Sequence, residues 1–260
     1  MKLDKMKYNK IFYDSVEHRA SNAASEIANI FQNYFEINSI KDIGCGSGIW
    51  AREFEKILRC EKITGYDLES GIKIALSKNR ETKIKFIPID FEKDKFNLRS
   101  TDLSLFLEVA EHLTPLTALR VIEEICRSSK YVIFSGAIKG QGGTNHINEQ
   151  SARYWIKEFE NNDFVAIDLF RERIKEMKKI PFYYRNNVFL FIQKDEFKKI
   201  TLLVSSKGQE LLNLKIKSDL PVKDYRKIVQ KISYKILSKV NYKIVNKIII
   251  LKDFFMVKLK

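Results

Sequence analysis

A glycine-rich segment at residues 42–48 constrains this chain more than any other feature. The β-branched run Ser39–Ile43 predicts a strand, and a helical pattern begins at Ile49, directly after three alternate glycines. Glycine allows the backbone to turn tightly and a ligand to approach it closely. The first turn of the following helix directs its unpaired backbone N–H groups towards such a ligand. A second predicted strand, Lys62–Tyr66, ends at Asp67, whose carboxylate can accept hydrogen bonds from both hydroxyls of a ribose. The sequence therefore predicts a site for a nucleoside-containing cofactor.

The form of this glycine loop indicates which cofactor it binds. A dinucleotide-binding loop would place its third glycine at position 49, where this chain has Ile49. The pattern Asp-x-Gly-Cys-Gly-x-Gly, which starts at Asp42, instead resembles motif I of the class I S-adenosylmethionine-dependent methyltransferases. By that resemblance Asp42 serves the cationic amino group of S-adenosylmethionine. We expect Cys45 to be a small apolar residue of the loop and not a nucleophile.

The resemblance continues at the end of the third predicted strand. In the methyltransferase pattern, Asp90 hydrogen-bonds the exocyclic amine of adenine and Phe91 packs on the ring. The alternative is that Asp90 only caps a turn.

The segment Leu107–Leu113 resembles the EVAEHL motif that follows strand four in many small-molecule methyltransferases. The resemblance places Glu108 and Val109 at the cofactor and gives Glu111 and His112 a structural role. The full set of predicted cofactor residues is Asp42, Gly44, Cys45, Gly46, Gly48, Asp67, Leu68, Asp90, Phe91, Glu108 and Val109.

A polar, glycine-rich segment at residues 140–150 follows the fifth predicted strand, where an acceptor substrate would lie. Histidine suits proton transfer near neutral pH, so His146 is the candidate general base, with Glu149 as its orienter or as an alternative base. The alternative is that both side chains only fix the loop. The sequence has no clear ligand spacing for a metal ion, so none is expected.

Together with the downstream Tyr-Trp pair, this segment resembles a bacterial methyltransferase family often encoded among surface-polysaccharide genes. The family carries a QGG-T-x-H-x-NEQ…YW signature, and the resemblance covers about residues 8–193. The chain departs from the family near Lys175–Met177, where the family usually has a tryptophan, and at the first aromatic residue before Tyr184, where Phe182-Tyr183 stands. The resemblance implies a saccharide hydroxyl as the acceptor.

Alternating strand and helix patterns predict an α/β fold with a doubly wound, mostly parallel, seven-stranded sheet. A helix is expected near Glu149–Glu160, with Trp155 at helical spacing from Phe159, and residues 183–187 are expected as the entry to a strand. Acidic residues that end four of these strands should meet at one sheet edge. We expect a methyltransferase domain over residues 1–195 and a lysine-rich, amphipathic helical tail over residues 196–260. The predicted strands are Ser39–Ile43, Lys62–Tyr66, Lys83–Ile89, Asp102–Leu107, Tyr131–Ser135, Phe164–Leu169 and Val188–Ile192.

The net charge of +14 is concentrated in the tail, where residues 198–260 hold 16 Lys+Arg against 4 Asp+Glu. Lysines recur every fourth residue over residues 227–250. Such a helix can lie on an anionic membrane surface or remain a solvated appendage. Nucleic acid is a weaker interpretation, because the tail holds a single arginine, Arg226.

The three cysteines show no pairing pattern, and the N-terminus lacks the apolar core of a signal peptide. Both features predict a cytoplasmic protein, with or without peripheral contact with a membrane. The predicted function is methyl transfer from S-adenosylmethionine to a small-molecule or glycan acceptor. The alternatives are methylation of RNA or of another small molecule, and a membrane-associated interaction module that binds the cofactor without catalysis.

Overall fold

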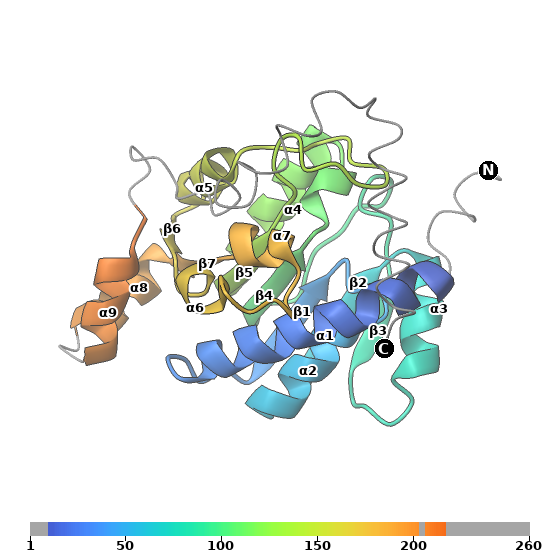
Figure 1. Ribbon diagram of the computed structural model, residues 1–260, viewed down its shortest axis with the longest axis horizontal. Coiled ribbons are helices and arrows are strands. Elements are labelled where there is room, and N and C mark those ends of the chain that lie inside the picture. The colour runs from blue at the N-terminus through green and yellow to red at the C-terminus, as the bar shows by residue number, and fades with distance from the viewer. Residues whose placement is uncertain (1–9, 203–205, 217–260) are drawn as a thin grey trace. The chain divides into compact units, whose positions relative to one another are not determined.

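The computed structural model describes residues 10–202 and 206–216, which form a sheet covered by helices on both faces (Figure 1). The sheet has seven strands in the order β3-β2-β1-β4-β5-β7-β6. Neighbouring strands run parallel from β3 to β5, and β7 pairs antiparallel with both β5 and β6. The strands are β1 (Ser39–Ile43), β2 (Lys62–Asp67), β3 (Lys85–Pro88), β4 (Thr101–Leu107), β5 (Ser129–Ser135), β6 (Phe164–Ile167) and β7 (Phe189–Gln193).

Helices connect all consecutive strands except β3 and β4, as the alternating sequence pattern predicts. Together with the strand order they give the α/β, Rossmann-like fold of the methyltransferases. The helices are α1 (Lys10–Gln32), α2 (Ile49–Leu58), α3 (Glu69–Lys78), the short 3-10 helix η2 (Ala110–His112), α4 (Pro115–Arg127), α5 (Ala152–Asn161), α6 (Arg171–Ile174), α7 (Phe182–Asn187), α8 (Lys194–Leu202) and α9 (Ser206–Leu214).

Two hydrophobic cores lie on opposite faces of the sheet. Alternate residues of β4 divide between them: Leu105 packs in the core that contains α1 and α2, and Phe106 packs in the core that contains α4 and α5. This period of two is what a strand buried on both faces requires. Figure 1 shows α1 and α2 below the sheet and α4 and α5 above it. The sheet therefore has a fixed register, and its carboxyl edge is a rigid platform for a site.

Several element boundaries differ from those expected. Helix α5 begins at Ala152 because the Ser151 hydroxyl caps it by accepting the Tyr154 N–H, whereas the sequence pattern placed its start near Glu149. That residue belongs instead to the preceding loop. Residues 183–187, expected as the entry to a strand, lie in the short helix α7.

The chain continues beyond β7 as two helices that pack against the sheet domain. Phe197 of α8 and Leu211 of α9 are buried in the core on the α1 side. The backbone N–H of Ile216 donates to Ala166 of β6. Residues as far as Ile216 therefore contact the sheet domain. The predicted boundary after residue 195 stays a prediction, and most of the lysine-rich tail, residues 217–260, lies outside the described residues.

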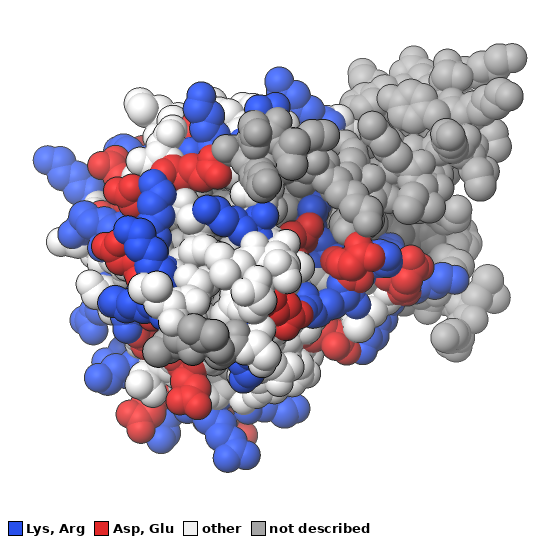
Figure 2. Space-filling model, turned by 90° about the vertical axis from the view of Figure 1, so that its left-hand side faces the viewer, with Lys and Arg blue, Asp and Glu red and all other residues white. Residues whose placement is uncertain are grey.

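Charges of both signs alternate over the described domain, and Figure 2 shows them around a central uncharged area on one face. This agrees with the near balance of 31 Lys+Arg and 29 Asp+Glu in residues 1–197. Within residues 10–202 and 206–216, no helix has the length and apolarity needed to cross a membrane.

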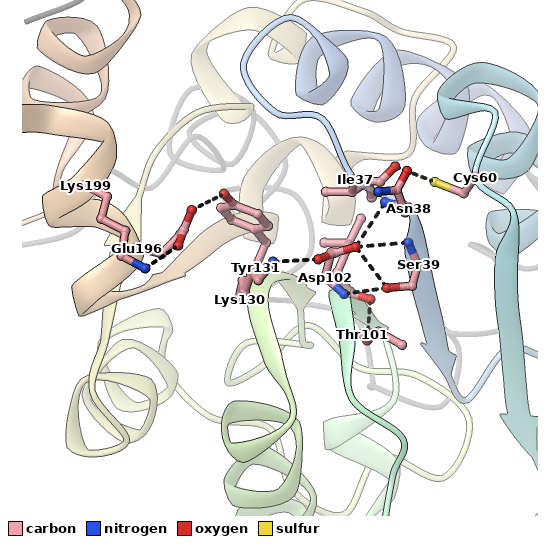
Figure 3. A network of polar contacts seen from close by, with 11 residues as sticks. Ile37, Asn38, Ser39, Cys60, Thr101, Asp102, Lys130, Tyr131, Glu196 and Lys199 are labelled. Atoms are coloured by element: carbon pink, nitrogen blue, oxygen red, sulfur yellow. Dashed lines mark hydrogen bonds and ion pairs between the residues drawn. The ribbon is translucent and has the colours of Figure 1, made fainter. Parts of the chain in front are cut away.

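At the amino edge of the sheet, Asp102 joins the starts of three parallel strands (Figure 3). Its Oδ2 accepts the backbone N–H groups of Asn38 and Ser39 at 3.0 and 3.2 Å, and Oδ1 lies 2.9 Å from the Lys130 ammonium. Burial alone would raise the pKa of Asp102, but the hydrogen bonds from Lys130, Asn38 and Ser39 outweigh it and lower the pKa. The ionised carboxylate of Asp102 thus stabilises the sheet.

We expect Asp102→Ala to lower the free energy of unfolding by about 2 kcal/mol at pH 7, because the change leaves two backbone donors without their charged acceptor. The depressed pKa means that this stabilisation is present above the unfolded-state value, near pH 4, and is lost as the pH falls through the lower folded-state value. Urea unfolding at pH 7 and at pH 3 measures both effects. Lys130→Ala, which removes a half-exposed ion pair, is the matched control and should cost less than about 1 kcal/mol.

Candidate active site

The site lies where the strand order reverses, at the carboxyl ends of β1 and β4. The chain proceeds outward from β1 to β2 and β3 and then returns to the other side of β1 as β4. The connections after β1 and β4 therefore lead away in opposite directions and leave a crevice between them. The glycine loop, residues 44–48, follows β1, and Glu108 and Val109 follow β4.

Gly44 permits direct contact between these two segments. Its φ of +72° is a left-handed conformation, and a Cβ atom there would lie 2.4 Å from Cγ2 of Val109. A side chain at this position would therefore be strained and would overlap Val109. The predicted cofactor residues Gly44 and Val109 are thus adjacent.

Asp42 occupies the end of β1 with one oxygen unsatisfied. The residue is 3% exposed, and Oδ2 has no hydrogen-bond partner. Burial, opposed by a hydrogen bond from the Ala51 backbone and aided by the charge of Asp67, raises the pKa of Asp42 to about 7. A buried, unsatisfied carboxylate beside a glycine loop fits a cationic partner such as the amino group of an amino-acid tail.

Asp67 closes the loop from the end of β2. Its Oδ2 accepts the Gly46 N–H and its Oδ1 accepts the Leu68 N–H, both at 2.6 Å. A Cβ atom on Gly71 would lie 2.7 Å from Oδ1, so the absence of a side chain there makes room for the carboxylate. Burial raises the pKa of Asp67 to about 6, against the two backbone hydrogen bonds. Each oxygen retains a further lone pair for a ribose hydroxyl.

Asp90 and Phe91 follow β3 at the same edge. Asp90 accepts the Glu92 N–H at 3.1 Å and pairs with Lys93 at 2.5 Å, so it does cap a turn. Phe91 is buried and meets Phe96 edge to face. A role for Asp90 and Phe91 at adenine stays a prediction.

Two buried carboxyl groups, Glu108 and Glu111, lie together after β4. Glu108 has a left-handed φ of +56°, a strained conformation for this residue type. Burial raises the pKa of Glu108 to about 7. Burial and the charge of Glu108 raise the pKa of Glu111 well above its usual range. Neither oxygen of Glu111 has a hydrogen-bond partner. Three of the four carboxyl oxygens of this pair, both of Glu111 and Oε1 of Glu108, are therefore buried without a hydrogen-bond partner.

His146 and Glu149 are in direct contact in the loop after β5. His146 Nδ1 lies 2.9 Å from Glu149 Oε1, while the Gly140 and Gly142 N–H groups each donate to Glu149 at 2.8 Å. Burial alone would raise the pKa of Glu149, but these hydrogen bonds outweigh it and lower the pKa. Glu149 therefore both fixes the loop and orients the imidazole. The geometry brings together the two residues that the sequence singled out, without testing their catalytic roles.

The same loop is anchored to the segment after β4. The backbone N–H groups of Ile147 and Asn148 donate to the Glu111 carbonyl at 2.9 and 3.1 Å, and Asn148 Nδ2 donates to the Ala110 carbonyl at 3.2 Å. His112 and His146 meet edge to face with ring centroids 4.9 Å apart. Glu111 and His112, given a structural role from the sequence, therefore lie in the same cluster as His146. No local spacing could have shown this, because β5 separates the two segments.

Aromatic residues near the site serve mainly as packing. Trp155 is 1% exposed and packs on Phe134, as the helical spacing predicts. Tyr184 is buried against Trp50, whose Nε1 donates to the Tyr184 hydroxyl at 3.3 Å. The sequence did not indicate this contact between α2 and α7. Tyr183 and Tyr154 remain half-buried and so retain some exposed ring surface.

Comparison with known families gives a match at residues 40–131 to a family described as "Methyltransferase domain". The matched region begins in β1 and ends in β5, so it contains the glycine loop and the acidic residues that follow β2, β3 and β4. The match and the fold support a class I S-adenosylmethionine-dependent methyltransferase domain, with S-adenosylmethionine as the cofactor, as the sequence predicts. No curated protein matches the chain.

Among solved structures, an O-methyltransferase family 2 protein from Planctomyces limnophilus DSM 3776, in complex with apigenin, is similar with a TM-score of 0.55 and 14% identity. The alignment covers 74% of this chain and 62% of that one. The plantazolicin methyltransferase BpumL, in complex with S-adenosylhomocysteine, is similar with a TM-score of 0.52 and 16% identity. The alignment covers 74% of this chain and 91% of that one. A putative O-methyltransferase from Nostoc punctiforme PCC 73102 has a TM-score of 0.52 and 15% identity, and the alignment covers 67% of this chain and 57% of that one. This chain thus spans less than two thirds of two of these three proteins, and at such identities the likeness concerns the fold.

Proposed function

We propose that this protein transfers the methyl group of S-adenosylmethionine to a hydroxyl of a saccharide acceptor in surface-glycan synthesis. The observation that carries the methyl-transfer part is the unsatisfied, buried Oδ2 of Asp42 at the end of β1, beside the glycine loop and Asp67. This arrangement offers a carboxylate to an ammonium group and a second carboxylate to a ribose, and it lacks the third glycine that a pyrophosphate-binding loop carries.

The acceptor side supports a hydroxyl. When bound, S-adenosylmethionine supplies a methyl carbon on a sulfonium, which an oxygen nucleophile attacks as the carbon–sulfur bond breaks and its electron pair remains on sulfur. The acceptor must then lose a proton, and the cluster of Glu111, His112 and His146 provides groups that can assist this loss. The buried polar atoms of Glu108 and Glu111 without partners suit a hydroxyl-rich acceptor, since each could pair with an acceptor group. The choice of a saccharide rests on the resemblance carried by the loop signature.

Replacement of His146 by alanine tests the division between cofactor binding and acceptor chemistry. We expect S-adenosylmethionine affinity to stay within about threefold of the wild type and methyl transfer to fall by about 10²–10⁴-fold, the usual contribution of a group that handles a transferred proton. Calorimetry measures the first, and transfer of a labelled methyl group to saccharide, lipid-linked saccharide and RNA acceptors measures the second. Lys157→Ala, an exposed change in α5 outside this loop, is the control and should alter neither.

Two results would contradict the proposal. Equal loss of cofactor binding in His146→Ala and in an Asp67 variant would refute the separation of roles. Label that enters RNA, and no saccharide, would refute the acceptor.

A further inference from the structure

Two histidines and a buried carboxylate converge beside the acceptor loop. Glu111 and His112 belong to η2, and His146 belongs to the loop after β5. One ligand atom from each of the three side chains lies within 4.8 Å of those of the other two. The structure therefore brings together two nitrogen donors and one oxygen donor from segments on either side of β5.

Glu111 is the strongest indication that the cluster receives a cation. The residue is 0% exposed, and neither carboxylate oxygen has a hydrogen-bond partner. Burial of a carboxyl group without partners is unfavourable, and nearby Glu108 has a further unsatisfied oxygen, Oε1. A positive ion bound between these groups would satisfy oxygens that no described protein group satisfies.

Both histidines are held as metal-binding histidines usually are. Glu149 Oε1 lies 2.9 Å from Nδ1 of His146, and this carboxylate is itself fixed by the Gly140 and Gly142 N–H groups. His112 hydrogen-bonds the backbone of Asn145. In metal sites a ligating imidazole commonly donates one ring N–H to a carboxylate or a backbone carbonyl, which fixes the orientation of its other nitrogen. Each ring here has such an orienting partner.

We propose that Glu111, His112 and His146 bind a divalent transition metal ion such as Zn²⁺. Two imidazoles and one carboxylate form a donor set suited to Zn²⁺ and its neighbours, whereas Mg²⁺ and Ca²⁺ prefer oxygen ligands throughout. Ligand atoms of a tetrahedral zinc site lie about 3.4 Å apart, which follows from metal–ligand bonds of about 2.1 Å. Since the ligand atoms here lie within 4.8 Å of one another, they must approach one another by up to about 1.4 Å on binding. Three protein ligands leave a coordination position for the acceptor.

The role of the ion, though not its binding, rests on the proposed function. A hydroxyl bound to a divalent ion releases its proton to solvent more readily, and the resulting oxygen attacks the methyl carbon while the carbon–sulfur electron pair stays on sulfur. His146 then assists the loss of the acceptor proton as a ligand of the ion, whereas its sequence pattern predicts a general base.

The test is a titration of the chelator-treated full chain with Co²⁺, followed by visible absorption, and with Zn²⁺, followed by calorimetry, both without S-adenosylmethionine. We expect one ion per chain. Glu111→Gln and His146→Ala should each weaken binding by about 100-fold or more, and Glu149→Gln by about 10–100-fold, as for an outer partner of a ligand. Glu92→Gln removes a carboxylate that hydrogen-bonds Thr114, near the cluster but outside it, and is the matched control with unchanged affinity.

Few other side chains of this protein can bind the added Co²⁺ or Zn²⁺ and disturb the titration. The three cysteines are buried, and the chain has one further histidine, His18. Glu111→Gln keeps the side-chain shape and removes a buried charge, so we expect it to fold. Circular dichroism checks this, and His146→Ala, at a less buried residue of the cluster, provides an independent variant.

Absence of Co²⁺ and Zn²⁺ binding by the wild type, or wild-type affinity in the variants of Glu111 and His146, would overturn the inference. Metal binding without S-adenosylmethionine binding would support the metal site and refute the proposed function. Cofactor binding and methyl transfer by a chain that binds no metal would do the reverse.

Discussion

Replacement of Asp67 by alanine is expected to weaken the binding of S-adenosylmethionine by at least about 100-fold. A hydrogen bond to a charged group contributes about 1.5–3 kcal/mol, and the carboxylate is expected to accept two from the ribose. It also accepts the Gly46 and Leu68 N–H groups at 2.6 Å, so its loss leaves the glycine loop without an internal acceptor. Calorimetric titration of the two proteins measures the change. Asp195→Ala, which removes a carboxylate whose side chain is 77% exposed, is the control and should bind as the wild type does.

The pH dependence of affinity gives a second test of the same carboxylate. The pKa of Asp67 is raised to about 6 and that of Asp42 to about 7, in both cases first by burial. Both groups serve the cofactor in their ionised form, so affinity should fall as the pH decreases through this range. In Asp67→Ala the part of the decrease centred near pH 6 should disappear. Affinity that is constant from pH 8 to pH 5 would contradict the assigned roles.

Replacement of Gly44 by alanine is expected to lower the free energy of unfolding by about 3 kcal/mol and to reduce cofactor affinity. A left-handed conformation costs a non-glycine residue about 1–2 kcal/mol, and the new Cβ would overlap Val109. Gly140 separates these two effects, because its φ is +78° but no atom lies within 4 Å of the corresponding Cβ position. Gly140→Ala should therefore cost only about 1 kcal/mol.

A double-mutant cycle isolates the overlap. In the Val109→Ala variant, Gly44→Ala should lower the free energy of unfolding by little more than Gly140→Ala does in the wild type. The reason is that the shortened side chain at position 109 removes the close contact. Urea unfolding of the single and double variants provides these values. If Gly44→Ala and Gly140→Ala are equally destabilising in the wild type, the close contact with Val109 does not determine the choice of glycine.

The sequence predicted the framework of the fold because its signals are local. Strand β1 and helix α2 have the predicted residues, since a β-branched run and a helical period are each complete within a short segment. The glycine loop and Asp67 were predicted for the same reason. The start of α5 was misplaced because Glu149 bonds to Gly140 and Gly142, which no helical period records.

The acceptor side could be predicted only in part. The residues His146 and Glu149 stand close in the chain, so their contact was foreseeable. The approach of His112 to His146 and the burial of Glu111 depend on how the loop after β5 packs on the segment after β4, through backbone hydrogen bonds from Ile147 and Asn148. Such contacts depend on the tertiary structure and not on any spacing in the sequence. For that reason the metal-ligand cluster became visible only in the fold.

The central claim is that the crevice between β1 and β4 binds S-adenosylmethionine. The most direct measurement is a calorimetric titration of the wild-type chain with S-adenosylmethionine and S-adenosylhomocysteine, with NAD as the dinucleotide control. We predict one site per chain for each of the first two ligands and none for NAD, because the loop has Ile49 where a third glycine would be needed. Binding of NAD, or no binding of either sulfur compound, would contradict the assignment.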